Sequence, residues 1–185
     1  MSDYLGSTVP VEDRDCWRTP IEIFTALDLE FGFYLDAAAS RENTLCASYL
    51  ALSEQDALRH DVDWVSHGAI WCNPPYSNIK PWIIKATEQC IRQRQTIVML
   101  VPADISTQWF KLAMGSVDEI RLITDGRINF TPVTASGKKG SNPKGSMLLI
   151  WRPFITPRSQ FTTVSKVALV EAGTQYLEEV QAQCA

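Results

Sequence analysis

The sequence has none of the patterns that mark a zinc protein, a disulfide-stabilised protein or a membrane protein. Its five cysteines are scattered and never form Cys-x-x-Cys, and it has only two histidines, so we expect no metal site. The odd number of cysteines indicates reduced thiols, most of them packed inside a cytoplasmic protein. No apolar run approaches the roughly 20 residues that cross a bilayer, and the polar, acidic start is unlike a signal peptide.

Composition predicts one soluble domain with an uneven distribution of charge. The 185 residues are 45% hydrophobic and 21% charged, which is ordinary for a globular protein of a size that buries a substantial core. The net charge is −4, but residues 121–158 hold seven basic residues against Asp125 alone, a net +6, so the remainder carries −10. A basic segment on an acidic body is typical of one localised polyanion contact, and a solvated lysine-rich loop explains the count equally well.

Short apolar runs that are typical of buried strands alternate with helical patterns. We predict strands at residues 33–35, 69–72, 96–101, 119–123 and 147–151, and helices that begin at residue 20 and cover 81–90, 109–114 and 166–182. This alternation predicts an α/β fold, with a Rossmann-like, mostly parallel sheet and helices on both faces. The Gly- and Lys-rich stretch 136–146 is expected as a long loop, within a C-terminal hairpin between the last two strands.

We divide the chain into three parts. Residues 1–16 are expected to form a flexible N-terminal arm, residues 17–158 the domain, and residues 159–185 a helical extension packed on that domain. Thr19 is expected to cap the first helix, with Pro20 at the first helical position and Glu22 returning the capping-box hydrogen bond.

Asp36 and Asn73 both follow predicted strands, at the end of the sheet where α/β proteins bind ligands. Asn73 opens the sequence Asn73-Pro74-Pro75-Tyr76. The Asn73 side-chain oxygen and the Pro74 carbonyl could accept both N–H bonds of a planar amine and make its nitrogen a better nucleophile, while the prolines fix the backbone. Tyr76 offers a ring on which a base can stack. The motif therefore predicts methyl transfer to an amino nitrogen, although a rigid turn after a strand is its simpler interpretation.

The chain resembles the phage-type DNA N-6-adenine methyltransferase (Dam-like) family from about Trp17 to Trp151. The resemblance rests on five segments in a fixed order: Trp17-Arg18-Thr19-Pro20; Leu35-Asp36-Ala37-Ala38-Ala39-Ser40 with Asn43; Asn73-Pro74-Pro75-Tyr76-Ser77 with Trp82; Val101-Pro102-Ala103 with Thr107, Trp109 and Phe110; and Gly126-Arg127-Ile128-Asn129-Phe130. Each segment alone is weak, and the ordered set is specific.

The resemblance implies a phage- or prophage-encoded, S-adenosylmethionine-dependent methyltransferase that acts in the cytoplasm of a bacterial host. Its substrate would be adenine in double-stranded DNA, flipped out of the helix at a short recognition site. The catalytic residues would be Asn73, Pro74, Pro75 and Tyr76. The cofactor-binding residues would be Trp17, Thr19, Pro20, Asp36, Ala37, Ala38, Asp56 and Asn73, with the start of the first helix facing the methionine carboxylate. The DNA-binding residues would be Arg127, Lys138, Lys139 and Lys144.

The sequence departs from the general methyltransferase pattern at one position. Most methyltransferases have a Gly-x-Gly loop after the first strand, whereas here three alanines follow Asp36; small residues still permit close approach of a cofactor. A surface acid at Asp56 and a core side chain at Phe130 are equally simple interpretations of those two residues. Other functions stay open: methylation of RNA or of protein glutamine, a non-catalytic DNA-binding or anti-restriction protein on a decayed methyltransferase fold, and, least favoured, a small-molecule binder.

Overall fold

The main structural element is a seven-stranded sheet. The computed structural model describes residues 17–51, 56–132, 140–141 and 144–184. The strands lie in the order β10-β6-β9-β5-β4-β2-β3. Their bounds are β2 Phe33–Ala39, β3 Ser48–Ala51, β4 Ala69–Cys72, β5 Ile97–Pro102, β6 Glu119–Thr124, β9 Ser146–Trp151 and β10 Gln160–Ser165. Only β9 runs antiparallel to its neighbours β5 and β6, so the prediction of a mostly parallel sheet is confirmed.

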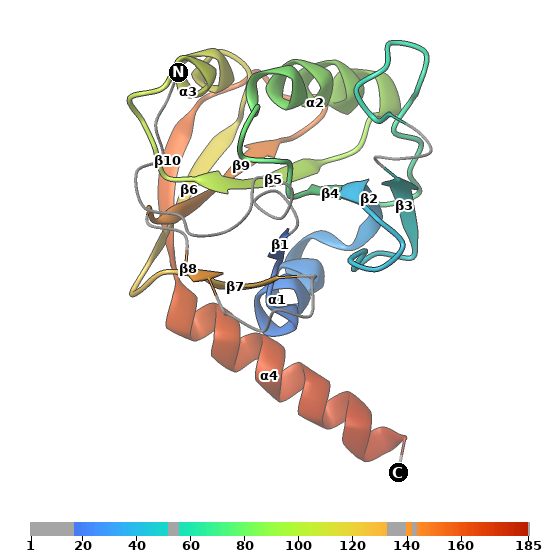
Figure 1. Ribbon diagram of the computed structural model, residues 1–185, viewed down its shortest axis with the longest axis vertical. Helices are drawn as coiled ribbons and strands as arrows, with labels where there is room; N and C mark the ends of the chain where they lie inside the picture. The colour runs from blue at the N-terminus through green and yellow to red at the C-terminus, as the bar shows by residue number, and fades with distance from the viewer. Residues whose placement is uncertain (1–16, 52–55, 133–139, 142–143, 185) are drawn as a thin grey trace.

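Helices cover both faces of this sheet, as the alternation in the sequence predicts (Figure 1). Helices α2 (Lys80–Gln93) and α3 (Gln108–Met114) pack on one face, and α1 (Ile21–Phe31) and α4 (Lys166–Gln183) on the other. Strand β5 explains why: its six residues are all buried, with Ile97, Met99 and Val101 in the α2–α3 core and Val98 and Leu100 in the α1–α4 core. A strand that is buried on both faces requires apolar residues at every position.

A second, smaller sheet lies beside α1. It joins β1 (Trp17–Arg18), β7 (Asn129–Pro132) and β8 (Gly140–Ser141) in the order β1-β7-β8. The β7–β8 pair is antiparallel, and it falls between β6 and β9 along the chain, where the hairpin was expected. The expected loop 136–146 is thus interrupted by a short strand at 140–141. Residues 133–139 and 142–143 lie outside the described part of the chain, as do residues 1–16, where the arm was expected.

Three local predictions were wrong. The segment after Pro157 was expected to be helical, but residues 160–165 form β10, which pairs in parallel with β6. Its Phe161, Val164 and successive threonines are strand-forming residues, a signal that the nearby prolines obscured. Strand β3 was not predicted, since it is short and follows a polar stretch. The strand expected to end at Asp36 continues to Ala39, because the three alanines are buried within the sheet.

The start of α1 also differs from the prediction. Thr19 was expected to cap the helix, but Pro20 is the N-cap, with φ −54° and ψ 135°, and no side chain caps this end. Pro20 itself adopts the extended conformation of a cap residue, and the first helical bond runs from the Phe24 amide to the Pro20 carbonyl at 3.1 Å. The helix therefore starts one residue later than expected, and the Thr19 side chain is left for another role.

Helix α2 buries the apolar residues that recur at helical spacing along it: Trp82, Ile83, Ala86 and Cys90. The described cysteines Cys46, Cys72, Cys90 and Cys184 are free thiols, of which Cys72 and Cys90 are buried. Across the described residues, no helix combines the length and the apolar composition needed to span a membrane.

Helix α4 packs closely on α1 through Gly173. A Cβ built on Gly173 would lie 1.8 Å from the Glu22 carbonyl oxygen, which is far inside van der Waals contact. The first half of α4 is held in this way against the domain, with Leu169 buried beside Gly173. In Figure 1 the second half of α4 projects away from the sheet.

We expect Gly173→Ala to destabilise the protein by about 2–3 kcal/mol, because α1 and α4 would have to move apart. Urea denaturation measures the loss. Gly115→Ala is the matched control, since a Cβ at Gly115 meets its nearest neighbour, the Leu112 carbonyl oxygen, at an ordinary 3.5 Å. Equal unfolding free energies for the two variants would contradict the close packing of α4 on α1.

Candidate active site at the carboxyl ends of the strands

The Asn-Pro-Pro-Tyr loop leaves the centre of the sheet. Strand β4 lies between β2 and β5, and Trp71 in β4 pairs with Asp36 on one side and Val98 on the other. Asn73 follows β4 directly. The structure therefore brings Asn73 and Asp36 to adjacent strands on the same edge of the sheet, where parallel strands present their ligand-binding loops.

The loop is rigid and largely shielded from solvent. Pro74 is buried, while Asn73, Pro75 and Tyr76 are half-buried. The two prolines fix the backbone, and the Asn78 amide donates to the Pro75 carbonyl at 3.4 Å. The Tyr76 ring meets Phe130 of β7 edge to face, with centroids 6.2 Å apart and an interplanar angle of 88°. Because Phe130 is buried, this contact holds the half-buried Tyr76 ring in a fixed orientation.

Asp36 carries a buried carboxyl group. It is 4% exposed, and its Oδ1 accepts a hydrogen bond from the Ala38 amide at 3.2 Å. Burial raises the pKa of Asp36 to about 7, and backbone hydrogen bonds from Ala38 and Leu45 only partly oppose this shift. Among the described residues, no cation pairs with Asp36. Ala37 and Ala38 beside it are buried and small, so they leave room close to the backbone.

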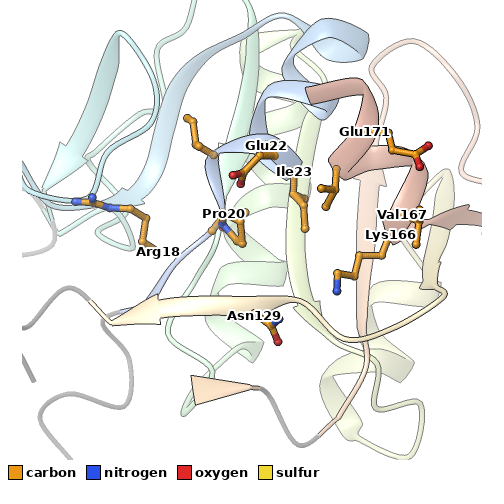
Figure 2. Close-up of a pocket in the computed structure, with 11 residues that line it drawn as sticks. Arg18, Pro20, Glu22, Ile23, Asn129, Lys166, Val167 and Glu171 are labelled. Carbon is orange, nitrogen blue, oxygen red and sulfur yellow. The ribbon is translucent and has the colours of Figure 1, made fainter. Parts of the chain in front are cut away.

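Thr19 and Pro20 line a groove of about 790 Å³ between α1, α4 and β7 (Figure 2). Thr19 is 2% exposed, and within the described residues its hydroxyl oxygen has no hydrogen-bond partner. The groove also takes in the first turns of α1 and α4, so the positive ends of two helix dipoles face it. The remaining lining residues are Arg18, Ile21, Glu22, Ile23, Asn129, Lys166, Val167, Val170 and Glu171. Asp36 and Asn73 are not part of this lining.

Two other expected cofactor residues lie at the margins of the described chain. Asp56 is exposed, and its Oδ1 accepts a hydrogen bond from the Leu58 amide at 3.0 Å, so it caps a surface turn. Trp17 belongs to β1, where its backbone pairs with Pro132.

Several basic residues of the segment 121–158 are held in ion pairs within the protein. Arg121 pairs with Glu30 and Glu119, and Arg152 pairs with Asp118 and Glu119, so both arginines are structural. Lys144 is exposed and forms an ion pair with Asp104. Arg127 is exposed immediately before β7. Lys138 and Lys139 lie outside the described residues.

Two polar residues with a notable position in the structure were not identified from the sequence. Lys166 lines the groove from the first turn of α4, and Ser146 is buried at the start of β9. Ser146 is the polar residue that precedes the apolar run 147–151, a signal that a search for strand ends would have found.

The buried Asp36 carboxyl predicts a pH-dependent stability. Its pKa is raised from 3.8 to about 7 in the folded protein, so between about pH 4 and 7 folding takes up a proton and stability falls as pH rises. Asp36→Asn removes this effect. From pH 5 to pH 8, its unfolding free energy relative to wild type is expected to rise by about 2–3 kcal/mol.

Denaturation of both proteins at each pH measures this difference. Asp61→Asn is the control, because Asp61 is exposed and its hydrogen bond with Arg59 holds its pKa below the usual value. A difference between Asp36→Asn and wild type that does not change with pH would show that the Asp36 carboxyl is ionised throughout this range.

Comparison with known proteins places these features in one family. The family model described as DNA N-6-adenine-methyltransferase (Dam) matches residues 6–176. The chain is 34% identical over 149 residues to a DNA N-6-adenine-methyltransferase of Haemophilus phage HP1, covering 80% of this chain and 84% of that protein. It is 35% identical over 164 residues to the enzyme of the same name from Escherichia phage T1, covering 80% and 67%. A putative methyltransferase of Escherichia coli, YfdM, is 40% identical over 77 residues, covering 38% and 77%. The chain therefore belongs to the DNA N-6-adenine-methyltransferase (Dam) family.

Proposed function

We propose that the protein transfers a methyl group from S-adenosylmethionine to the exocyclic amino group of adenine, at a short recognition site in double-stranded DNA. The observation that carries this proposal is the position of Asn73-Pro74-Pro75-Tyr76 at the carboxyl end of β4, with Phe130 against the Tyr76 ring. A base flipped out of the duplex can stack on Tyr76 and place its amino group at Asn73. The two phage relatives, named as DNA N-6-adenine-methyltransferases, support the choice of adenine in DNA.

Asn73 and Pro74 would activate the amine by hydrogen bonding. The Asn73 Oδ1 and the Pro74 carbonyl accept its two N–H bonds and draw the nitrogen toward tetrahedral geometry, which makes its lone pair available. When bound, S-adenosylmethionine supplies an electrophilic methyl group on a sulfonium. Asn73 is neutral, so the amine keeps its proton until the nitrogen–methyl bond has formed. Alignment and fixed acceptors provide most of the rate enhancement in such a site.

The residues around Asp36 and Thr19 fit this cofactor chemically. The buried Asp36 carboxyl lacks a cationic partner among the described residues, and an ammonium group would supply one. The buried Thr19 hydroxyl and the start of α1 offer hydrogen-bond donors to a carboxylate. We assign Ala37 and Ala38 to close backbone contact with the cofactor, and Trp17, Pro20 and Asp56 to its surroundings.

We assign DNA phosphate contacts to Arg127, Lys138, Lys139 and Lys144, in and beside the segment that carries β7 and β8. We assign the reading of a short recognition site to the loops of this segment. Lys144 would exchange its ion pair with Asp104 for a phosphate.

The decisive experiment is to sequence DNA from cells that express the protein, with detection of modified bases, together with methyl transfer by the purified protein. N6-methyladenine at one short sequence, and labelled plasmid DNA, are expected. Label in protein or RNA alone would overturn the DNA assignment. DNA binding without any calorimetric signal for S-adenosylmethionine would instead indicate a non-catalytic DNA-binding protein.

Asn73→Ala is expected to reduce turnover about a hundredfold or more while cofactor affinity stays nearly unchanged, because an acceptor used in the transition state is lost. Steady-state methylation and calorimetry measure the two effects. Asn78→Ala, an exposed amide in the same loop, is the control and should match wild type in both. Loss of cofactor binding in Asn73→Ala with unchanged turnover would contradict the role given to Asn73.

A further inference from the structure

Ser146 lies at the end of the sheet from which the Asn-Pro-Pro-Tyr loop emerges. It is the first residue of β9 and pairs with Pro102, the last residue of β5. The chain just before it is anchored, since the Ala103 amide donates to the Gly145 carbonyl at 2.8 Å and Lys144 forms an ion pair with Asp104. The Ser146 side chain is therefore held on a rigid strand rather than on a loop.

Strand alternation sets the face on which the Ser146 hydroxyl lies. In β9, Met147 and Leu149 join the α2–α3 core, and Leu148 and Ile150 join the α1–α4 core. Ser146 therefore points to the same face as Leu148, the face that also holds Phe130. Trp71 of β4 lies on this face as well, and Asn73 comes two residues later, directly after the strand ends. Strand β5 alone separates β4 from β9, so the backbones of these two strands lie about 10 Å apart across the sheet.

The Ser146 hydroxyl is buried and, in the part of the chain that the structure describes, has no hydrogen-bond partner. Ser146 is 3% exposed, and no described residue makes a hydrogen bond with its Oγ. A buried hydroxyl that lacks a partner destabilises a protein, and alanine would fill the same space without that cost. Ser116, on the opposite face of the sheet, shows the usual arrangement: its Oγ bonds to Trp151 Nε1 at 3.1 Å and to Thr87 at 3.0 Å.

We propose that Ser146 recognises the target base, by donating its hydroxyl proton to a ring nitrogen that flanks the amino group held by Asn73. This inference rests on the proposed methylation of adenine. Adenine carries such an acceptor on either side of its amino group, N1 and N7. With Tyr76 under the ring and Asn73 at the amino group, a third contact at Ser146 fixes the rotation of the base in its own plane. Ser146 is thus a specificity-determining residue.

The test compares Ser146→Ala with wild type on duplexes that contain the modified sequence, with adenine, 7-deazaadenine or 1-deazaadenine at the target position. On adenine, Ser146→Ala should lower kcat/KM about tenfold, as expected for one lost hydrogen bond. Wild type should lose a similar factor on the analogue that lacks the contacted nitrogen. Ser146→Ala should lose nothing further on that analogue. If Ser146→Ala loses on both analogues the same further factor in kcat/KM that wild type loses, the proposal is overturned.

Stability measurements separate this role from a structural one. Ser146→Ala should keep or raise the midpoint of thermal unfolding, because the hydroxyl has no partner among the described residues. The matched control Ser116→Ala should lower the midpoint, and its dependence on the base analogues should equal that of wild type. A lowered midpoint for Ser146→Ala with unchanged kcat/KM would assign the hydroxyl to the fold. If wild type methylates no DNA, the proposed function fails; if wild type does and Ser146→Ala loses that same further factor on both analogues, only the role of Ser146 fails.

Discussion

Trp71 in β4 pairs with Asp36 in β2 and with Val98 in β5, and this parallel pairing brings Asn73 and Asp36 to the same end of the sheet. Parallel strands end on the same edge of a sheet, so residues that are far apart in sequence meet there. A slip of one residue in β4 would exchange the faces of its side chains and shift the loop that brings Tyr76 against Phe130. The buried apolar residues on both faces of β4 and β5 oppose that slip.

The antiparallel strand β9 begins at the end of the sheet where the parallel strands β4 and β5 end. It lies between β5 and β6, and the chain that leads to it passes through the small sheet with β7. This path places Phe130 against Tyr76 and starts β9 with a buried serine at the edge of the site. The chain from the end of β6 to the start of β9 therefore supplies both Phe130 and Ser146.

Buried carboxylates in this protein fall into two kinds. Burial opposes the ionisation of Glu119, but hydrogen bonds from Arg121, Thr162 and Arg152 outweigh it and lower its pKa to about 2. Asp36 is more deeply buried, and the backbone hydrogen bonds from Ala38 and Leu45 only partly offset this burial, so its pKa rises to about 7. The first carboxylate stabilises the fold within its own ion-pair cluster. The second is suited to a cationic ligand, and an unpaired buried carboxyl is the kind of strain that functional sites carry.

The sequence by itself determined the α/β class, the helices on both faces and the position of Asn73 after a buried strand, because apolar periodicity and Pro-Pro geometry are local properties. It also determined the family, through ordered motifs. Only the tertiary structure decided that β9 is antiparallel, that β10 extends the sheet and that α4 packs on α1 through Gly173, since strand partners and helix contacts join distant segments. Sequence patterns likewise predicted Thr19 as a helix cap and predicted no role for Ser146. The buried hydroxyls of both residues became visible only when the surrounding elements were in place, because burial and the lack of a partner are properties of the packed chain.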